Sequence, residues 1–441
     1  MRLFEKNIKY MAFISVCCAC IIFLGFKQFK QVNINRCISS DGKGYYAYLP
    51  ALFIYQDIQF SYVDAYENKY YNPQNKVDFT NTVADKQVNK YWSGVAVMIL
   101  PFFLFAHTLA ILFNQAADGY SFIYQAMVAV AACFYLVLGL VFLRKLLLRY
   151  TISESVIGLT LFSLVFATNL FYYTVAEPSM SHVYSFCLIC LFAYTAKKYF
   201  DSYITKYWYI LILLLALITL LRPSNMMVAF ACPFFAGSFN NLKKGVAQIN
   251  KGKLMKALLI FFTVLSIQLA YYKWATGNFW VYSYGNEHFN FLHPQFFDFL
   301  FSYRKGLFVY APILLLATIG FTVLYKQSPF QMMSLFAFMI LIVFVLSSWW
   351  MWYYGGGFGM RPMIDYFVFF AFLLSLLIQR IMSSQKGGYV AMLMLMILCV
   401  AAQIQTYQKV NFIMPWDGMN KEIYWKIFLK TDKSYIGKYK A

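Results

Sequence analysis

"SGVAVMILPFFLFAHTLAILF", from Ser93 to Phe113, is the stretch of the sequence on which the topology depends. It carries no Asp, Glu, Lys or Arg, and it is as long as the roughly 20 apolar residues that cross a hydrocarbon core. If it crosses, every later loop moves to the other side of the membrane. The rest of the chain has to decide whether it does.

The composition is that of a protein with many membrane crossings. Of the 441 residues, 61% are hydrophobic, 21% are aromatic and only 12% are charged, and the mean hydropathy is +0.58. Long apolar runs recur along the chain with short polar links between them. We predict an all-α fold, with one integral-membrane domain over residues 1–404 and a short tail over residues 405–441 on the outer face.

The apolar runs predict about eleven transmembrane helices. They cover residues 10–28, 120–143, 155–175, 182–196, 207–221, 223–240, 254–273, 306–325, 331–349, 362–381 and 388–404. Residues 31–119 then form a long first loop on the outer face, and short outer turns follow the third, fifth and ninth helices.

The net charge of +20 is explained by topology, because the basic residues stand singly or in pairs between apolar runs. We therefore expect membrane lipids as partners and no nucleic acid. With the N-terminus in the cytoplasm, the links that become cytoplasmic hold Arg144, Lys145, Arg149, Lys197, Lys198, Lys206, Lys243, Lys244, Lys251, Lys253, Lys256, Lys326, Arg380 and Lys386. Lys27 and Lys30 disagree with this orientation.

The same charge count bears on Ser93–Phe113. Counting it as a full crossing would move the "RKLLLR" link, residues 144–149, to the outer face. We therefore expect a re-entrant or interface-lying element, broken near Pro101 because proline removes a helical hydrogen bond. The alternative is an ordinary twelfth crossing.

Acidic residues gather at two outer turns. Asp41 and the following Tyr45 and Tyr46 lie in "SSDGKGYYAYLP", just past the first apolar run, although a plain turn residue would also fit "SDGKG". Glu177 lies in "TVAEPSMSH", between two spans, with His182 five residues later. A helix N-terminal acid and a structural histidine are the alternatives there.

Basic residues on the outer face run against the topological bias and favour an anionic partner. They are Arg222 in "LRPSN", Arg304 and Lys305 in "FSYRKGLFVYAP", and Arg361 in the turn "SSWWMWYYGGGFGMRPMIDY". Snorkelling to lipid headgroups is the alternative for Arg222. The last turn also holds Trp350, Trp352 and Asp365, and although an interfacial belt explains its aromatics, it does not explain the glycines or Arg361.

Together these motifs resemble the GT-C glycosyltransferases, the polytopic enzymes that take sugars from polyprenyl phosphates. Asp41 matches the essential acid of that superfamily's first outer loop, and Glu177 matches the acidic turn between the third and fourth spans. The juxtamembrane helices of its first loop correspond to Ser93–Phe113. The stretches around "TGNFWVYSYGNEHFNF" and "WWMWYYGGGFGMRPMID" are similar to those of bacterial members, and the resemblance ends near Ile404.

The resemblance implies a function and a location. The chain would be a multi-pass enzyme of the bacterial cytoplasmic membrane that moves a sugar, with inversion, from a polyprenyl-phosphate donor to a lipid, glycan or protein acceptor on the outer face. Asp41 would be the base, with Glu177 as a second catalytic acid. The donor phosphate would meet Arg222, Arg304, Lys305 and Arg361, and Tyr45, Tyr46, Trp350 and Trp352 would pack on the sugar or lipid, with His182 and Asp365 as secondary candidates.

The chain departs from the superfamily where a metal would bind. Gly42 follows Asp41 in place of a second acid, and Glu177 stands alone, so a divalent metal is disfavoured and no cofactor is expected. Two other functions compete with transfer. A transporter or flippase of a lipid-linked sugar would show inverted repeats or interrupted spans near the midplane, and the third alternative is a non-catalytic scaffold.

Overall fold

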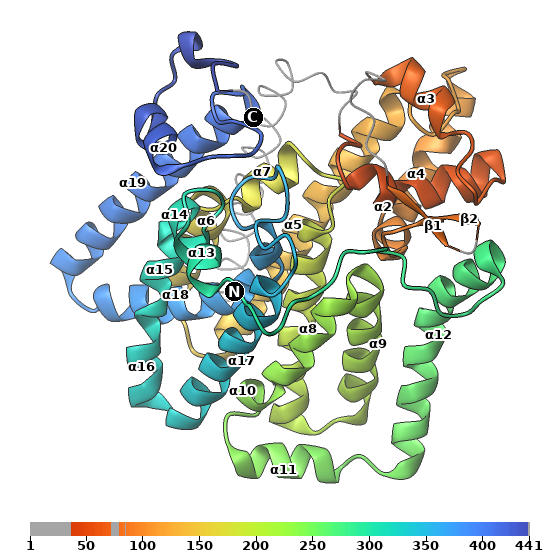
Figure 1. The fold of residues 1–441 in the computed structure, drawn as a ribbon. Coiled ribbons are helices and arrows are strands. Elements are labelled where there is room, and N and C mark those ends of the chain that lie inside the picture. The colour runs from red at the N-terminus through yellow and green to blue at the C-terminus, as the bar shows by residue number, and fades with distance from the viewer. Residues whose placement is uncertain (1–36, 72–78, 84, 440–441) are drawn as a thin grey trace.

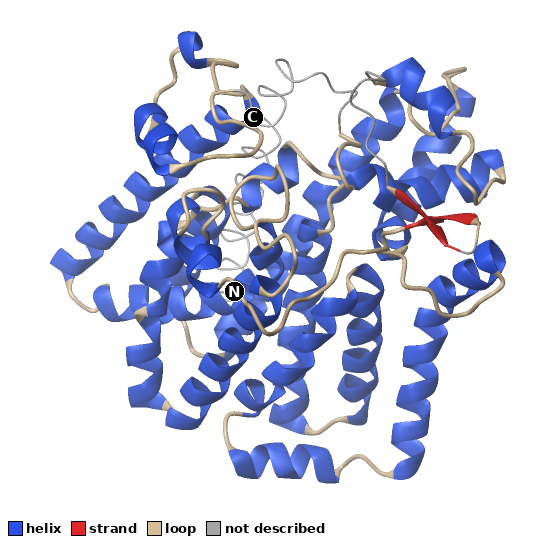
Figure 2. Ribbon diagram, viewed as in Figure 1, coloured by secondary structure: helices blue, strands red, loops and turns tan. Residues whose placement is uncertain are grey.

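The computed structural model describes residues 37–71, 79–83 and 85–439, so the first expected span, residues 10–28, lies outside the described residues. The described chain is mainly helical, with long loops and one two-stranded sheet (Figure 2). By length and composition, the helices able to cross a membrane are α4 (Gly94–Leu112), α5 (Phe122–Arg149), α12 (Lys251–Thr276), α17 (Pro329–Ser347), η5 (Arg361–Tyr366) with α18 (Phe367–Ile381), and α19 (Gln385–Val410). A helical, multi-pass membrane protein is confirmed at this level, and the count of eleven crossings stays a prediction.

Shorter elements complete the described chain. Before α4 lie α2 (Gly42–Pro50), the π-helix η2 (Ala51–Tyr55), α3 (Val63–Tyr70), β1 (Thr80–Val83) and β2 (Lys86–Asn89). Between α5 and α12 lie α6 (Glu154–Phe166), α7 (Leu170–Val175), α8 (His182–Ser202), α9 (Thr205–Leu221), η4 (Pro223–Ala231), α10 (Cys232–Ala236) and α11 (Phe239–Ala247). The later short helices are α13 (Phe296–Phe301), α14 (Leu307–Tyr310), α15 (Pro312–Thr318), α16 (Gly320–Gln327), α20 (Lys421–Ile427) and η6 (Lys433–Tyr435).

The helices pack side by side in a bundle, and long loops gather at one end of it (Figure 1). In Figure 1, α8, α9 and α12 are upright, α11 crosses their lower end, and the sheet and long loops lie at the upper end. We call the upper end, where α8 begins and α9 and α12 finish, the site end. α5 packs along α8 in the same direction, because Tyr135 contacts Tyr184 near the start of α8, and Arg149 pairs with Asp201 near its end.

Ser93–Phe113 differs from its expected form. α4 is one helix that runs through Pro101, so the predicted break is wrong. Proline removes only one backbone hydrogen bond, and packing against α2, α5 and α9 on several sides holds the helix together.

Both ends of α4 lie toward the site end. Its start, Gly94, lies against the backbone of Leu220 at the end of α9. Its other end lies beside the start of α5, where His107 Nδ1 is 2.5 Å from the Tyr124 hydroxyl. Figure 1 places α3 and α4 beyond the upper ends of α8 and α9. α4 therefore does not run alongside those two helices.

Three expected spans are interrupted, which corrects their predicted continuity. Residues 155–175 form α6 and α7 with a break between them. At the break the Thr168 hydroxyl donates a hydrogen bond to Leu164 O at 2.6 Å and accepts one from Leu170 N at 3.1 Å, in place of helical backbone bonds. Residues 223–240 form the 3₁₀ helix η4 followed by α10, and each of these starts at or next to a proline. Residues 306–325 form α14, α15 and α16.

The described part of the first loop folds around the Asp41 segment. Lys43 Nζ lies 2.6 and 2.8 Å from the two carboxylate oxygens of Glu67, and both side chains are buried, so this pair fastens α2 to α3. β1 and β2 pair antiparallel, with Thr80 opposite Asn89. Asn89 then donates to Gly44 O at 2.7 Å and ties the sheet to α2.

Candidate functional site

A cavity of about 460 Å³ opens at the site end. Loops that are distant in the sequence form its walls: the start of α2, the segment after β2, the turn before α8, the loop after α12, the aromatic turn before η5, and the C-terminal segment, residues 411–439. Its aromatic lining consists of Tyr45, Tyr91, Trp92, Trp280, Tyr282, Tyr284, Phe289, Trp349, Trp350, Tyr354 and Trp416. Its charged lining consists of Asp41, Lys90, Glu177, Arg222, Glu287 and Arg361.

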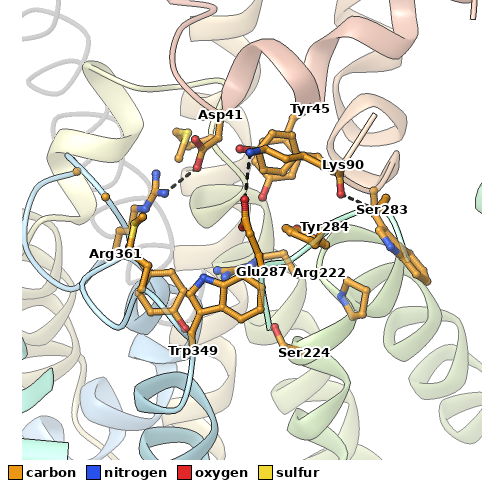
Figure 3. Close-up of a pocket in the computed structure, with 18 of the residues that line it drawn as sticks. Asp41, Tyr45, Lys90, Arg222, Ser224, Ser283, Tyr284, Glu287, Trp349 and Arg361 are labelled. Carbon is orange, nitrogen blue, oxygen red and sulfur yellow. Dashed lines mark hydrogen bonds and ion pairs between the residues drawn. The ribbon is translucent and has the colours of Figure 1, made fainter. Parts of the chain in front are cut away.

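Asp41 makes a long-range ion pair inside this cavity. Its Oδ2 accepts from Arg361 NH2 at 2.7 Å, across 320 positions of sequence (Figure 3). Asp41 occupies the cap position of α2 but makes no side-chain cap hydrogen bond, so a local helix cap does not explain it. Burial favours the neutral carboxyl, yet Arg361, with the Tyr91 hydroxyl and Lys90, outweighs burial and holds the pKa of Asp41 below its usual value. At neutral pH Asp41 is therefore ionised.

Glu177 lies next to this pair but in a different electrostatic state. Its Oε1 accepts from the Tyr172 hydroxyl at 3.0 Å, while its Oε2 has no hydrogen-bond partner among the described residues. Burial raises the pKa of Glu177, and the nearby Arg361 and Lys409 only partly oppose this. The two acids predicted from sequence thus meet in one cavity with their pKa values moved in opposite directions.

Gly42 lets these two acidic turns touch. A Cβ at position 42 would lie 1.9 Å from Ser179 Oγ and 2.7 Å from Ser179 Cβ, which real side chains do not tolerate. The backbone also joins the turns, since Ser39 N donates to Ser179 Oγ at 3.4 Å. The glycine that replaces a second acid after Asp41 therefore has a packing role.

Arg222 forms part of the cavity wall, and a buried carboxylate behind the wall binds its guanidinium. Its NH1 lies 3.2 Å from Oδ2 of Asp365, a fully buried carboxylate. Asp365 also contacts His182 Nδ1 at 2.9 Å and accepts from Asn225 Nδ2 at 2.7 Å. Asp365 and Asn225 thus form a network behind the cavity that fixes the direction of the Arg222 guanidinium.

A second ion pair lines the cavity near Asp41. Lys90 Nζ lies 3.3 Å from Glu287 Oε1, and Ser283 Oγ donates to the Lys90 carbonyl at 2.8 Å (Figure 3). Trp349, in the aromatic turn, forms an isolated antiparallel bridge with Phe289 of the same loop as Glu287. Sequence reasoning missed Lys90 and Glu287, because a lone charge in a long outer loop gives no signal of its own.

The structure divides the predicted site residues. Those that line the cavity are Asp41, Tyr45, Glu177, His182, Arg222, Trp350 and Arg361. Those placed elsewhere are Tyr46, Trp352, Arg304, Lys305 and Asp365. Tyr46 is a core residue whose hydroxyl donates to Gly119 O at 2.6 Å. Arg304 is engaged by Asp417, and Lys305 is buried against the Gly357 carbonyl.

The glycine-rich turn lies against other parts of the protein. A Cβ on Gly356 would lie 2.0 Å from the Trp416 ring, and one on Gly357 would lie 2.4 Å from the Tyr173 hydroxyl. These glycines let the turn pack closely against protein groups. In the described part of the chain, no three His, Cys, Asp or Glu side chains are grouped to hold a metal ion.

Comparisons with known proteins give no family. No protein-family model matches the chain, no curated protein matches it, and no solved structure matches it. What the site does has to be argued from its own residues.

Proposed function

We propose that the protein is a membrane glycosyltransferase that moves a sugar from a polyprenyl-phosphate donor to an acceptor hydroxyl at the outer membrane boundary. The observation that carries this proposal is the Asp41–Arg361 ion pair inside an aromatic-lined cavity at one end of a bundle of apolar helices. A lipid-borne substrate reaches such a cavity from the bilayer, and aromatic rings with a few charged groups suit a sugar phosphate.

The residues support a single displacement. The acceptor oxygen would form a bond to the anomeric carbon as its proton passes to the Asp41 carboxylate, and the bond from that carbon to the phosphate oxygen would break. The polyprenyl phosphate would leave with the electron pair. Arg361 and Arg222 are the cations in the cavity wall placed to stabilise its charge with bidentate hydrogen bonds.

The resting ion pair gives Asp41 a further property. Because Arg361 holds Asp41 ionised, a donor phosphate that competes for Arg361 would release the carboxylate for the acceptor hydroxyl. In the proposed reaction, donor binding therefore precedes proton transfer.

The test is the release of polyprenyl phosphate by the purified full-length protein in lipid nanodiscs. Labelled polyprenyl phosphates that carry different sugars serve as donors, and a cell-envelope extract supplies acceptors. Asp41→Asn should lower the release by about 10²–10⁴-fold, the usual worth of a general base. Asp85→Asn is the matched control, because Asp85 is an exposed residue of the same loop and lies outside the cavity lining. Wild-type release by a stably folded Asp41→Asn variant would end the assignment.

A transporter of lipid-linked sugar is the second candidate, and the interrupted helices favour it. The breaks between α6 and α7 and between α14 and α15 are of the kind found near transporter binding sites. The same nanodisc protein, moved into sealed vesicles, separates the two functions. Passage of the intact donor across the vesicle membrane without release of polyprenyl phosphate would support the transporter.

A further inference from the structure

We propose that Trp416 is a substrate-contacting residue that packs on the face of the donor sugar, and that Arg304 and Asp417 are positioning residues that hold it over the cavity. This inference rests on the proposed function and adds to it a residue that the C-terminal segment brings from outside the helix bundle. It also gives Arg304 a role other than phosphate binding.

The Trp416 indole has one face on protein and the other face open. The ring lies so close to Gly356 that a Cβ there would be 2.0 Å from the indole Cε2. Even so, Trp416 is 62% exposed, and it belongs to the cavity lining. A large aromatic ring seated on backbone and open to a cavity is well placed to bind an apolar ligand face.

Two buried lysines hold the backbone of Trp416. Its carbonyl accepts from Lys409 Nζ at 3.1 Å and from Lys305 Nζ at 3.4 Å. The same lysines donate to the glycine-rich turn, Lys409 to Gly356 O at 2.8 Å and Lys305 to Gly357 O. Among the described residues neither lysine forms an ion pair with a carboxylate. Their charged groups thus join the C-terminal segment to the wall of the cavity.

Arg304 fixes the next residue of the segment. Its Nε and NH2 meet Oδ1 and Oδ2 of Asp417 at 3.0 and 2.5 Å, in a two-point pairing that sets direction as well as distance. The Arg304 guanidinium also lies 3.3 Å from the centre of the Tyr353 ring, in the aromatic turn. The pair therefore ties Trp416 to the link between α13 and α14 and to the aromatic turn, without facing the cavity itself.

The position of Trp416 indicates the sugar as its ligand. Gly356, under the indole, is followed by Gly357, where a Cβ would lie 3.0 Å from Arg361 Cδ. A phosphate at Arg361 would place the attached sugar next to the indole. Trp416 comes from the segment that follows α19, so it faces the cavity from its loop side, away from the apolar helices that a prenyl chain would follow.

The experiment measures binding of two lipids to full-length protein in nanodiscs. One is a short-chain polyprenyl phosphate that bears the sugar giving the tightest binding among mannose, glucose, arabinose and N-acetylglucosamine. The other is the same polyprenyl phosphate without sugar. Trp416→Ala should weaken binding of the sugar lipid by about tenfold, as removal of an aromatic anchor does, and leave the bare lipid unchanged. Trp425→Ala, at an exposed tryptophan outside the cavity lining, should change neither.

The positioning role has its own readout. Asp417→Asn and Arg304→Gln keep the indole but release the segment, so each should weaken only the sugar lipid. Combined with Trp416→Ala they should add little, because both changes act through one ring. These variants also decide the matter if Trp416→Ala fails to fold.

The failures are distinguishable. If the wild type binds neither lipid, the proposed function falls and the sugar contact falls with it. If the wild type binds the sugar lipid and Trp416→Ala and Asp417→Asn bind it equally well, only this inference is overturned. An equal loss for both lipids in Trp416→Ala would place the indole on the lipid phosphate and would also overturn it.

Discussion

Glu177 and Asp41 lie in one cavity, yet burial and charge move their pKa values in opposite directions. Burial dominates at Glu177 and raises its pKa, whereas at Asp41 burial is outweighed by the Arg361 guanidinium together with Tyr91 and Lys90, and the pKa of Asp41 is lowered. Each shift links protonation to folding, because the folded state and the unfolded chain then bind protons differently. The two residues should therefore respond oppositely when they are neutralised.

The sign for Glu177 follows from its raised pKa. The folded protein holds this proton more tightly than the unfolded chain, so Glu177 lowers stability as pH rises above the usual glutamate pKa. We expect Glu177→Gln to match or exceed the wild-type thermal stability at neutral pH and to lose this part of the pH dependence. Thermal unfolding between about pH 2 and 8, which brackets the usual carboxyl pKa values, measures it.

Asp41→Asn serves as the opposite case in the same titration. Its folded pKa lies below the usual value, so its pairing stabilises the fold above the usual aspartate pKa and is lost as pH falls through the folded pKa. Asp41→Asn should lower stability at neutral pH and have less effect in acid.

The Glu177 prediction has a contrary outcome. A lower stability of Glu177→Gln than of the wild type at neutral pH would show that the Glu177 carboxylate is paired in the folded protein.

Among the elements, the start of α2 is the one that shapes the site. It carries Asp41 at its cap position, and it packs against the turn before α8 at Gly42 and Ser179. A helix start that approaches another turn so closely leaves no room for a side chain. The close contact of Gly42 with Ser179 therefore helps to set the placement of Asp41 relative to Glu177.

Gly42→Ala should separate the two acidic turns. The added methyl group overlaps Ser179, and we expect a loss of stability of about 1–3 kcal/mol, the usual cost of overpacking. Transfer activity should also fall, even at temperatures where the variant stays folded, because Asp41 moves away from Arg361. Unfolding and release of polyprenyl phosphate are measured on the same preparation.

Ser179→Gly is the matched second change. It removes the Oγ and Cβ atoms that the new methyl group would meet, so Gly42→Ala with Ser179→Gly should recover much of both properties. If Gly42→Ala alone were as stable and active as the wild type, close packing would not be the reason for a glycine at this position.

At the scale of the whole molecule, the distribution of basic residues predicts the orientation in the membrane. The basic links, including Arg144–Arg149, lie at the end of the bundle away from the cavity, where Arg149 pairs with Asp201 at the end of α8. α4 packs antiparallel along the first half of α5, from Met98 beside Tyr135 to His107 beside Tyr124, and counting it as no crossing stays a prediction. The cavity then faces outward.

Cysteine labelling tests this orientation. In a variant without native cysteines, Thr151→Cys should resist a membrane-impermeant reagent added to intact cells, while Lys433→Cys should react. Both positions are exposed in the folded protein, so burial does not protect either of them. Reaction at position 151 from outside would reverse the topology and make α4 a full crossing.

The candidate site could be predicted in part, and the reason lies in the charge rule. Asp41, Glu177, Arg222 and Arg361 were expected on one side of the membrane because each follows or precedes an apolar run of known direction, and all four do line one cavity. The rule gives a level in the membrane and no lateral position. Arg304 was expected at the same level but lies outside the cavity lining, paired with Asp417.

What the sequence by itself determined is the class of the protein, because length and apolarity of a segment are local properties that fix a helix able to enter a membrane. Only the tertiary structure decided which side chains meet in the cavity. The Asp41–Arg361 pair spans 320 positions, and Trp416 reaches the cavity from a segment with no recognisable pattern. It also decided that α4 runs unbroken through Pro101, since packing outweighs the loss of one backbone hydrogen bond. Such pairings depend on which loops meet in space, and no local property of the chain encodes that.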